Sequence, residues 1–134
     1  MSQIFSADAI RPSLPIAVVT TAETIAATGN ELPIPYVNGK VIIRGFILFT
    51  VGTDATSVTV RVRRGTSITS TLVSGAVAVT QGVAAAAVVA IPFYAVDIVG
   101  ALGTVQYSVT VQQAAATANG SIVDAVINTE VISG

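Results

Sequence analysis

The chain has 134 residues, of which 52% are apolar, and it contains no His, no Cys and no Trp. Six basic and seven acidic residues give a formal net charge of -1 at pH 7. The missing side chains exclude a Ser-His or Cys-His nucleophile pair, thiolate chemistry and the usual zinc, copper and haem sites. The balanced charge argues against nucleic acid or an anionic membrane as a partner.

A chain of this length fits one domain and can bury a core without disulfides. Its first 15 residues lack the basic and continuous apolar regions of a signal peptide, and they include Arg11, Pro12 and Pro15. We expect residues 1–15 to be an N-terminal arm that either lies across a neighbouring subunit or has no fixed structure. Residues 16–134 are expected to form the folded domain.

Apolar and polar residues alternate with a period of two, which is typical of strands with one buried face. In 57–65, for example, Val58, Val60 and Val62 share one side, and Arg61 and Arg63 share the other. Turn pairs such as Asn38-Gly39 and Asn119-Gly120 separate the apolar runs. The predicted strands are 16–27, 41–51, 57–64, 69–79, 83–98, 104–113 and 121–132, and the longer ones can be split. This pattern predicts an all-β fold, a single jelly-roll or related antiparallel β-sandwich of about eight strands.

Two segments, 41–51 and 83–99, are apolar on both faces. In the first, Val41, Ile43, Ile47, Phe49 and Val51 alternate with Ile42, Phe46 and Leu48. In the second, the run Ala84–Ala87 carries side chains small enough for close approach by another sheet or subunit. Alanine also favours helix, so a helix over 83–91 is the alternative to a strand.

The stretch from Gly82 to Leu102 is long enough to cross a bilayer and carries Asp97 as its one charge. Pro92, the absence of flanking Lys or Arg, and strand patterns on both sides argue against a membrane span. We therefore expect no membrane association.

The charged residues give few candidate sites. Arg61, Arg63 and Arg64 form a basic cluster, which is expected to be a charged strand face that discourages edge pairing. Asp97 has apolar neighbours and needs a partner if it is buried, and Arg44, the lone charge of the other two-sided strand, is the predicted partner. We predict no catalytic residue, no cofactor and no metal ligand.

The last third of the chain, TVQYSVTVQQAAATANGSIVDAVINTEVIS (104–133), resembles the closing hairpin of small jelly-roll structural proteins of bacteriophages and related viruses. It has a strand of alternating Val or Tyr and polar residues, a loop of small residues, and a final strand. That family includes capsid decoration proteins and the trimeric heads of fibres. The resemblance implies a symmetric homo-oligomer, a trimer, attached to a virion or forming part of one.

The two-sided strands favour self-association independently, because a monomer with a mean hydropathy of +0.80 would expose apolar patches. We expect the following residues at the oligomer interface: Ile42, Phe46, Leu48, Ala85, Ala87 and Val89. The predicted function is a non-enzymatic virion protein of the decoration, cement or fibre type, with a capsid protein or a host-surface receptor as further partners. The alternative is a carbohydrate- or receptor-binding β-sandwich module, which would be soluble or located at a cell surface.

Overall fold

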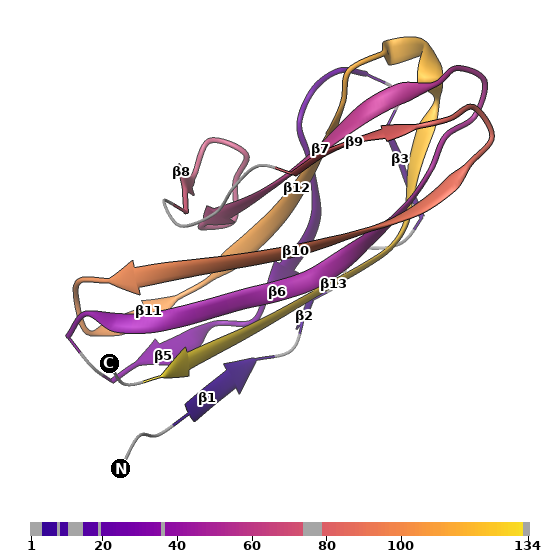
Figure 1. The fold of residues 1–134 in the computed structure, drawn as a ribbon. Coiled ribbons are helices and arrows are strands. Elements are labelled where there is room, and N and C mark those ends of the chain that lie inside the picture. Colours follow the sequence, from indigo (N-terminus) through magenta and orange to yellow (C-terminus); the bar gives the residue numbers. More distant parts are fainter. Residues whose placement is uncertain are drawn as a thin grey trace.

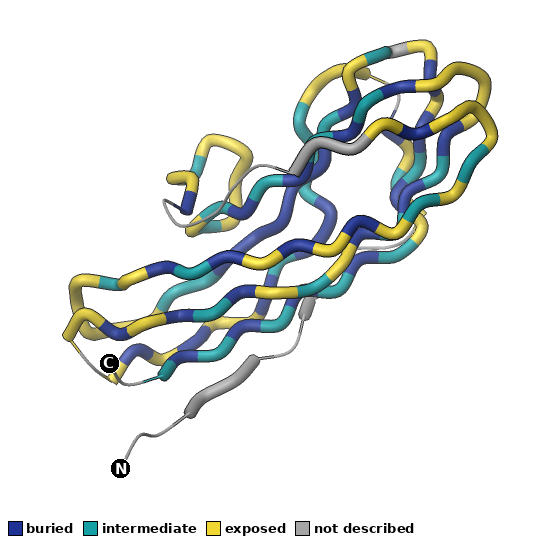
Figure 2. The backbone as a smooth tube through the Cα atoms, viewed as in Figure 1, coloured by how far each residue is buried: buried dark blue, intermediate teal, exposed yellow. Residues whose placement is uncertain are grey.

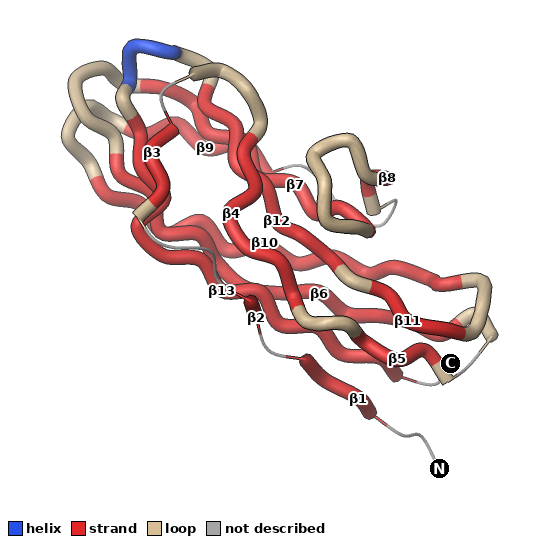
Figure 3. The backbone as a smooth tube through the Cα atoms, turned by 180° about the vertical axis from the view of Figure 1, so that it is seen from behind, coloured by secondary structure: helices blue, strands red, loops and turns tan. Residues whose placement is uncertain are grey.

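Strands make up most of the part of the chain that the structure describes, and one turn of helix interrupts them there (Figure 3). The computed structural model describes residues 4–7, 9–10, 15–18, 20–35, 37–73 and 79–132. Its elements are β1 (Ile4–Ala7), β2 (Ala9–Ile10), β3 (Ile16–Val18), β4 (Thr24–Gly29), β5 (Leu32–Ile34), β6 (Gly39–Thr50), β7 (Thr56–Arg64), β8 (Thr71–Leu72), β9 (Val79–Val83), β10 (Val88–Val99), β11 (Gly103–Val105), β12 (Tyr107–Gln113), the 3-10 helix η1 (Ala116–Ala118) and β13 (Gly120–Ile132).

Two antiparallel sheets form the layers of a sandwich (Figure 1). The first sheet has the strand order β1-β13-β6-β10, with β3 also paired to β13. The second has the order β2-β4-β12-β7-β8, with β9 also paired to β7, and β11 pairs with β5 beside them. Most neighbours within a sheet are distant in sequence, because the chain repeatedly crosses from one layer to the other, for example after β6, β9 and β12. The predicted all-β sandwich is confirmed.

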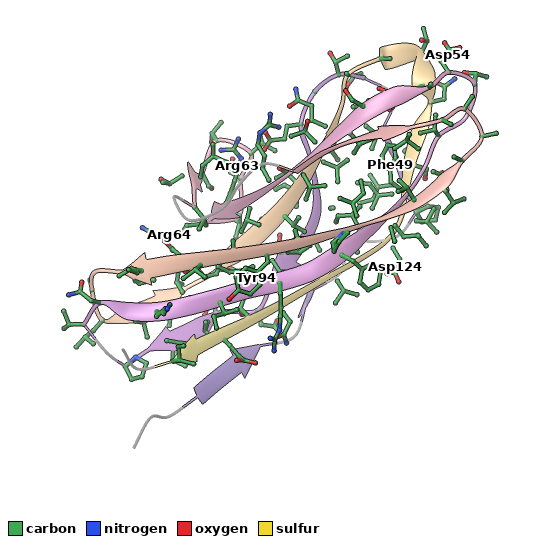
Figure 4. The ribbon with its side chains drawn as sticks, in the orientation of Figure 1. Phe49, Asp54, Arg63, Arg64, Tyr94 and Asp124 are labelled. Carbon is green, nitrogen blue, oxygen red and sulfur yellow. The ribbon has the colours of Figure 1, made fainter. Side chains whose placement is uncertain are left out.

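The core lies between the sheets and is filled by alternate residues of the long strands. In β6 the side chains of Val41, Ile43, Ile47 and Phe49 are fully buried, and Figure 4 shows Phe49 between the two layers. In β7 the apolar residues of the predicted alternation face inward in the same way. Figure 2 shows this alternation as buried and more exposed positions that succeed each other along β6, β7 and β10.

Gly45 lies in the middle of β6, at a position where the core side lacks a side chain. A Cβ atom at Gly45 would overlap the backbone carbonyl of Val126 on β13 and would lie 2.9 Å from Cζ of Phe93. Phe93 is the cross-strand partner of Gly45 on β10. The glycine therefore lets β13 approach closely and leaves space for the aromatic ring.

The predicted turns at Asn38 and Asn119 are confirmed, since both residues have positive φ, 57° and 49°. The predicted strand over 83–98, which was allowed to be split, begins only at Val88 apart from its first residue. β9 ends at Val83, a turn with Ala86 at φ 58° follows, and β10 begins at Val88. The alanine run forms neither strand nor helix because its backbone bonds the β6–β7 loop: Ala86 N donates to Gly52 O, and Val51 N donates to Ala87 O.

The closing hairpin expected over 104–133 is also absent as a pair. β12 pairs with β4 and β7 in the second sheet, whereas β13 pairs with β1, β3 and β6 in the first. The loop between them, which includes η1, carries the chain across the core. Each of the two strands has one core-facing side, and these sides face each other between the layers.

Two pieces of the predicted arm, β1 and β2, lie within the described residues. β1 pairs with β13 of the same chain, and β2 pairs with β4. We still only predict that the arm contacts a neighbouring subunit. The boundary between arm and domain at residue 15 is likewise a prediction.

Candidate functional site

The outer surface of the first sheet is mainly apolar. We call it the apolar face, and it consists of the outward residues of three strands: Val88, Ala90, Pro92, Tyr94, Val96 and Ile98 on β10; Lys40, Ile42, Arg44, Phe46, Leu48 and Thr50 on β6; and Ser121, Val123, Asp124, Val126, Asn128, Glu130 and Ile132 on β13. These side chains lie in rows across the sheet because the strands are in register. Pro92, Phe46 and Val126 form one such row.

Several large side chains of this face are exposed. Val88, Tyr94 and Ile98 are 62%, 60% and 60% exposed, and Phe46 and Val123 are exposed beside them. They come from three adjacent strands, so they form one continuous surface rather than scattered positions. Continuous exposed apolar surface on a soluble sandwich is typical of an interaction site.

A charge pair lies in the middle of the apolar face. Nη2 of Arg44 donates to Oε1 of Glu130 over 2.8 Å, and the Arg44 side chain is 53% exposed. Arg44 shares a row with Tyr94 and Asn128, and Glu130 is in the next row. Lys40 and Asp124 lie in rows nearer the two ends of the face, and Oδ1 of Asp124 accepts a hydrogen bond from the backbone N–H of Ala125.

The structure places three of the six predicted interface residues, Ile42, Phe46 and Leu48, on the apolar face. The other three do not lie there. Ala87 and Val89 pack against the core, and Ala85 lies in the turn between β9 and β10. The prediction assigned the wrong parity to this strand, because both of its faces are apolar and the turn before it was not recognised.

The outer surface of the second sheet is different, because polar side chains there bond one another. Nε and Nη2 of Arg63 donate to the two carboxylate oxygens of Glu23 over 2.6 and 2.9 Å. Arg61 donates to Gln112 over 2.6 Å and to Glu23 over 3.4 Å, and Gln112 donates to the carbonyl of Thr21. The hydrogen bond from Arg63 lowers the pKa of Glu23, although burial acts in the opposite direction. The shared outward side of Arg61 and Arg63 is as predicted, and Glu23 neutralises much of their charge.

Asp97 is buried at 2% exposure, and its partner is Arg64. Nε and Nη2 of Arg64 donate to Oδ2 and Oδ1 of Asp97 over 2.7 and 2.6 Å. The hydroxyl of the buried Tyr107 donates to Oδ2 over 2.7 Å. Burial, reinforced by the bond to Asp97, raises the pKa of Tyr107 far above its ordinary value.

The predicted pairing of Asp97 with Arg44 is therefore wrong, although a basic partner for Asp97 was correctly expected. Arg44 points outward from β6, whereas Asp97 points inward from β10. The sequence does hold the signal for Arg64. It follows Arg63 directly, so the two side chains leave the strand on opposite sides, and one of them is directed to the core side.

Within the described ranges, no group of three or more acidic residues is placed to hold a metal ion, and no pocket is present. The same part of the chain contains no helix with the length and apolar character that crossing a membrane requires.

Comparison with known proteins bears on the fold. No family model matches the chain, and no curated protein matches it. The solved structure of Eiger TNF from S. frugiperda is similar with a TM-score of 0.53 at 8% identity, over 98% of this chain and 93% of that one. A structure of infectious bursal disease virus, Gx strain, matches with a TM-score of 0.41 at 13% identity, over 98% of this chain and 30% of that one.

The fold is a jelly roll. The similarity to Eiger TNF spans both sheets. The two proteins share the sandwich architecture without a close sequence relationship. At 8% sequence identity this similarity shows the fold alone, so function has to be inferred from the surface residues of this chain.

Proposed function

We propose that this chain is a non-enzymatic structural protein that assembles with copies of itself, as a trimer, in a virion. Its role there is that of a capsid decoration, cement or fibre-type protein. The trimer and the virion come from the sequence resemblance of residues 104–133 to viral jelly-roll proteins, whose closing hairpin this chain does not form. The self-association comes from the surface of the sandwich.

The observation that carries the proposal is the contrast between the two outer surfaces. On the outer surface of the second sheet, hydrogen bonds link the side chains of four polar residues: Arg61, Arg63, Glu23 and Gln112. The first sheet exposes Phe46, Tyr94 and their neighbours to solvent. Covering apolar surface stabilises an assembly by about 25 cal/mol for each Å² removed from water. The apolar face is therefore the surface that gains most from a partner.

Light scattering coupled to size-exclusion chromatography tests the proposal. A trimer of the 13.5 kDa chain is expected for the wild-type protein. Phe46→Asp places a charge in the middle of the apolar face and is expected to shift the protein to monomer, because an unpaired charge is costly to bury. Leu72→Asp is the matched control: Leu72 is also exposed, at 49%, but lies on β8 in the second sheet, so this variant should keep the wild-type mass.

A wild-type monomer at micromolar concentration would overturn the proposal. If such a monomer also bound glycans on an array, the alternative of a recognition module would replace it. Placement of the gene among capsid or tail genes tests the virion role separately from self-association.

A further inference from the structure

We infer that the partner of the apolar face is a second copy of this chain, and that the symmetry axis of the assembly passes beside the Arg44–Glu130 pair. In this arrangement Arg44 of one copy also bonds Glu130 of the other. The inference rests on the proposed function and deepens it, because it names the contact that fixes how the copies align.

A partner that covers the apolar face has to supply hydrogen-bonding groups for Arg44 and Glu130. Among the described residues, the Arg44 guanidinium has one hydrogen bond, from Nη2 to Oε1 of Glu130. A guanidinium carries five N–H donors, and a carboxylate has a second oxygen that accepts hydrogen bonds. A molecule that covers this pair must provide a hydrogen-bond acceptor for the Arg44 guanidinium and a donor for the Glu130 carboxylate. Otherwise it leaves buried polar groups unpaired.

A second copy meets both requirements at once, because it carries the same arginine and the same glutamate. Arg44 pairs in register with Asn128, and Glu130 lies two residues further along β13. Two residues of strand span about 7 Å, which is within the reach of these two long side chains. When the symmetry axis passes beside this position, Arg44 of each copy lies within reach of Glu130 of its neighbour. The pair then forms a closed set of charges with no net excess.

The charge of the face also disfavours other partners. Its cations are Lys40 and Arg44, and its anions are Asp124 and Glu130, so the formal charges cancel. Nucleic acid and anionic lipid are bound by surfaces with excess positive charge. A neutral face with both signs in its interior lets each copy bond one neighbour through Arg44 and the other through Glu130, as a closed ring of three copies requires.

The edge of the sheet argues for contact through the face rather than by strand addition. β10 is the edge strand of the first sheet, paired with β6 alone among the described strands. A strand of this length would invite pairing with another copy, but Pro92 in its middle lacks a backbone N–H. Side chains of β6, β10 and β13 are left as the available contact.

Two charge-reversal variants test the inference: Arg44→Glu and Glu130→Arg, each purified alone and then mixed in equal amounts. Each variant alone should associate about tenfold or more weakly than the wild type, since charges of one sign then meet at the axis. The mixture should associate more strongly than either variant alone, because two of the three contacts in a mixed trimer then join opposite charges. Asp54→Lys is the matched control, since Asp54 is exposed in the β6–β7 loop away from this face, and it should behave as the wild type.

The double variant Arg44→Glu/Glu130→Arg checks folding, because it restores the pair within one chain and should assemble alone. If the wild type is oligomeric and both single variants keep its mass, the axis lies elsewhere and this inference is overturned, while the proposed function stands. If both variants are monomeric and remain so after mixing, a contact between Arg44 of one copy and Glu130 of another does not explain their loss of assembly, and the inference is overturned. A monomeric wild type overturns the proposed function itself.

Discussion

The buried carboxylate of Asp97 shows how strongly a single residue depends on the face from which it leaves its strand. Arg64 on β7 and Tyr107 on β12 both bond it, so one side chain of the first sheet is tied to two strands of the second. The Arg64 side chain is 39% exposed, which leaves its guanidinium partly hydrated while the carboxylate is not. This pairing lets a charged group lie in the core without an unpaired charge.

Replacement of Asp97 by Ala should therefore be costly. It leaves the Tyr107 hydroxyl buried without its acceptor and Arg64 without its carboxylate, so we expect the free energy of unfolding to fall by about 3 kcal/mol. Tyr107→Phe should cost about 1 kcal/mol, and the double variant should cost less than the sum because the two groups interact. Urea unfolding at pH 7 and fixed protein concentration measures these values. A change below about 0.5 kcal/mol for Asp97→Ala would contradict the structural role given to this cluster.

At the scale of the elements, the sequence predicts strands with one polar face well and strands with two apolar faces poorly. β7 was expected with the correct alternation, because polar residues mark its outward side. In β12 the polar side was expected to face solvent, but Ser108 and Thr110 on that side are fully buried. β10 has apolar residues on both sides, so its parity could not be assigned, and Val89 was placed on the wrong face. The turn at Ala84–Ala87 depends on hydrogen bonds to residues 51 and 52, which no local pattern reveals.

The segment that precedes β4 is tied to β7 by Glu23, and this tie should be sensitive to acid. Arg63 lowers the pKa of Glu23 from its ordinary value of 4.5. The contribution of Glu23 to stability is therefore complete above pH 4.5, and it is lost as the pH falls through the lower pKa of the folded state. At pH 7, Glu23→Gln should lower the free energy of unfolding by about 1–2 kcal/mol. The difference should shrink as the pH falls to about 3.

Urea unfolding at several pH values checks this tie, with Glu31→Gln as a control at an exposed acid. An equal difference between wild type and Glu23→Gln at pH 7 and pH 3 would contradict it.

The whole molecule is a sandwich whose two outer surfaces have different chemistry, although both sheets contribute to one core. On the outer surface of the second sheet, Arg61 and Arg63 bond Glu23. The first leaves apolar side chains and the Arg44–Glu130 pair at its surface. Composition alone indicated that surface would be buried between copies, but only the register of β6, β10 and β13 shows that it is one continuous face.

If copies of the chain cover this face, assembly and folding are linked, because binding that occurs only in the folded state stabilises that state by mass action. The midpoint of thermal unfolding should then rise with protein concentration. Tyr94→Lys removes an exposed aromatic side chain from the face without touching the core, and its midpoint should be lower and nearly independent of concentration. Ile68→Lys, at a similarly exposed apolar position in the β7–β8 loop, should retain the wild-type dependence. Differential scanning calorimetry over a hundredfold range of concentration, about 1 to 100 µM, measures the effect against the affinity range of stable oligomers. A wild-type midpoint that does not move over this range would contradict burial of the apolar face between subunits.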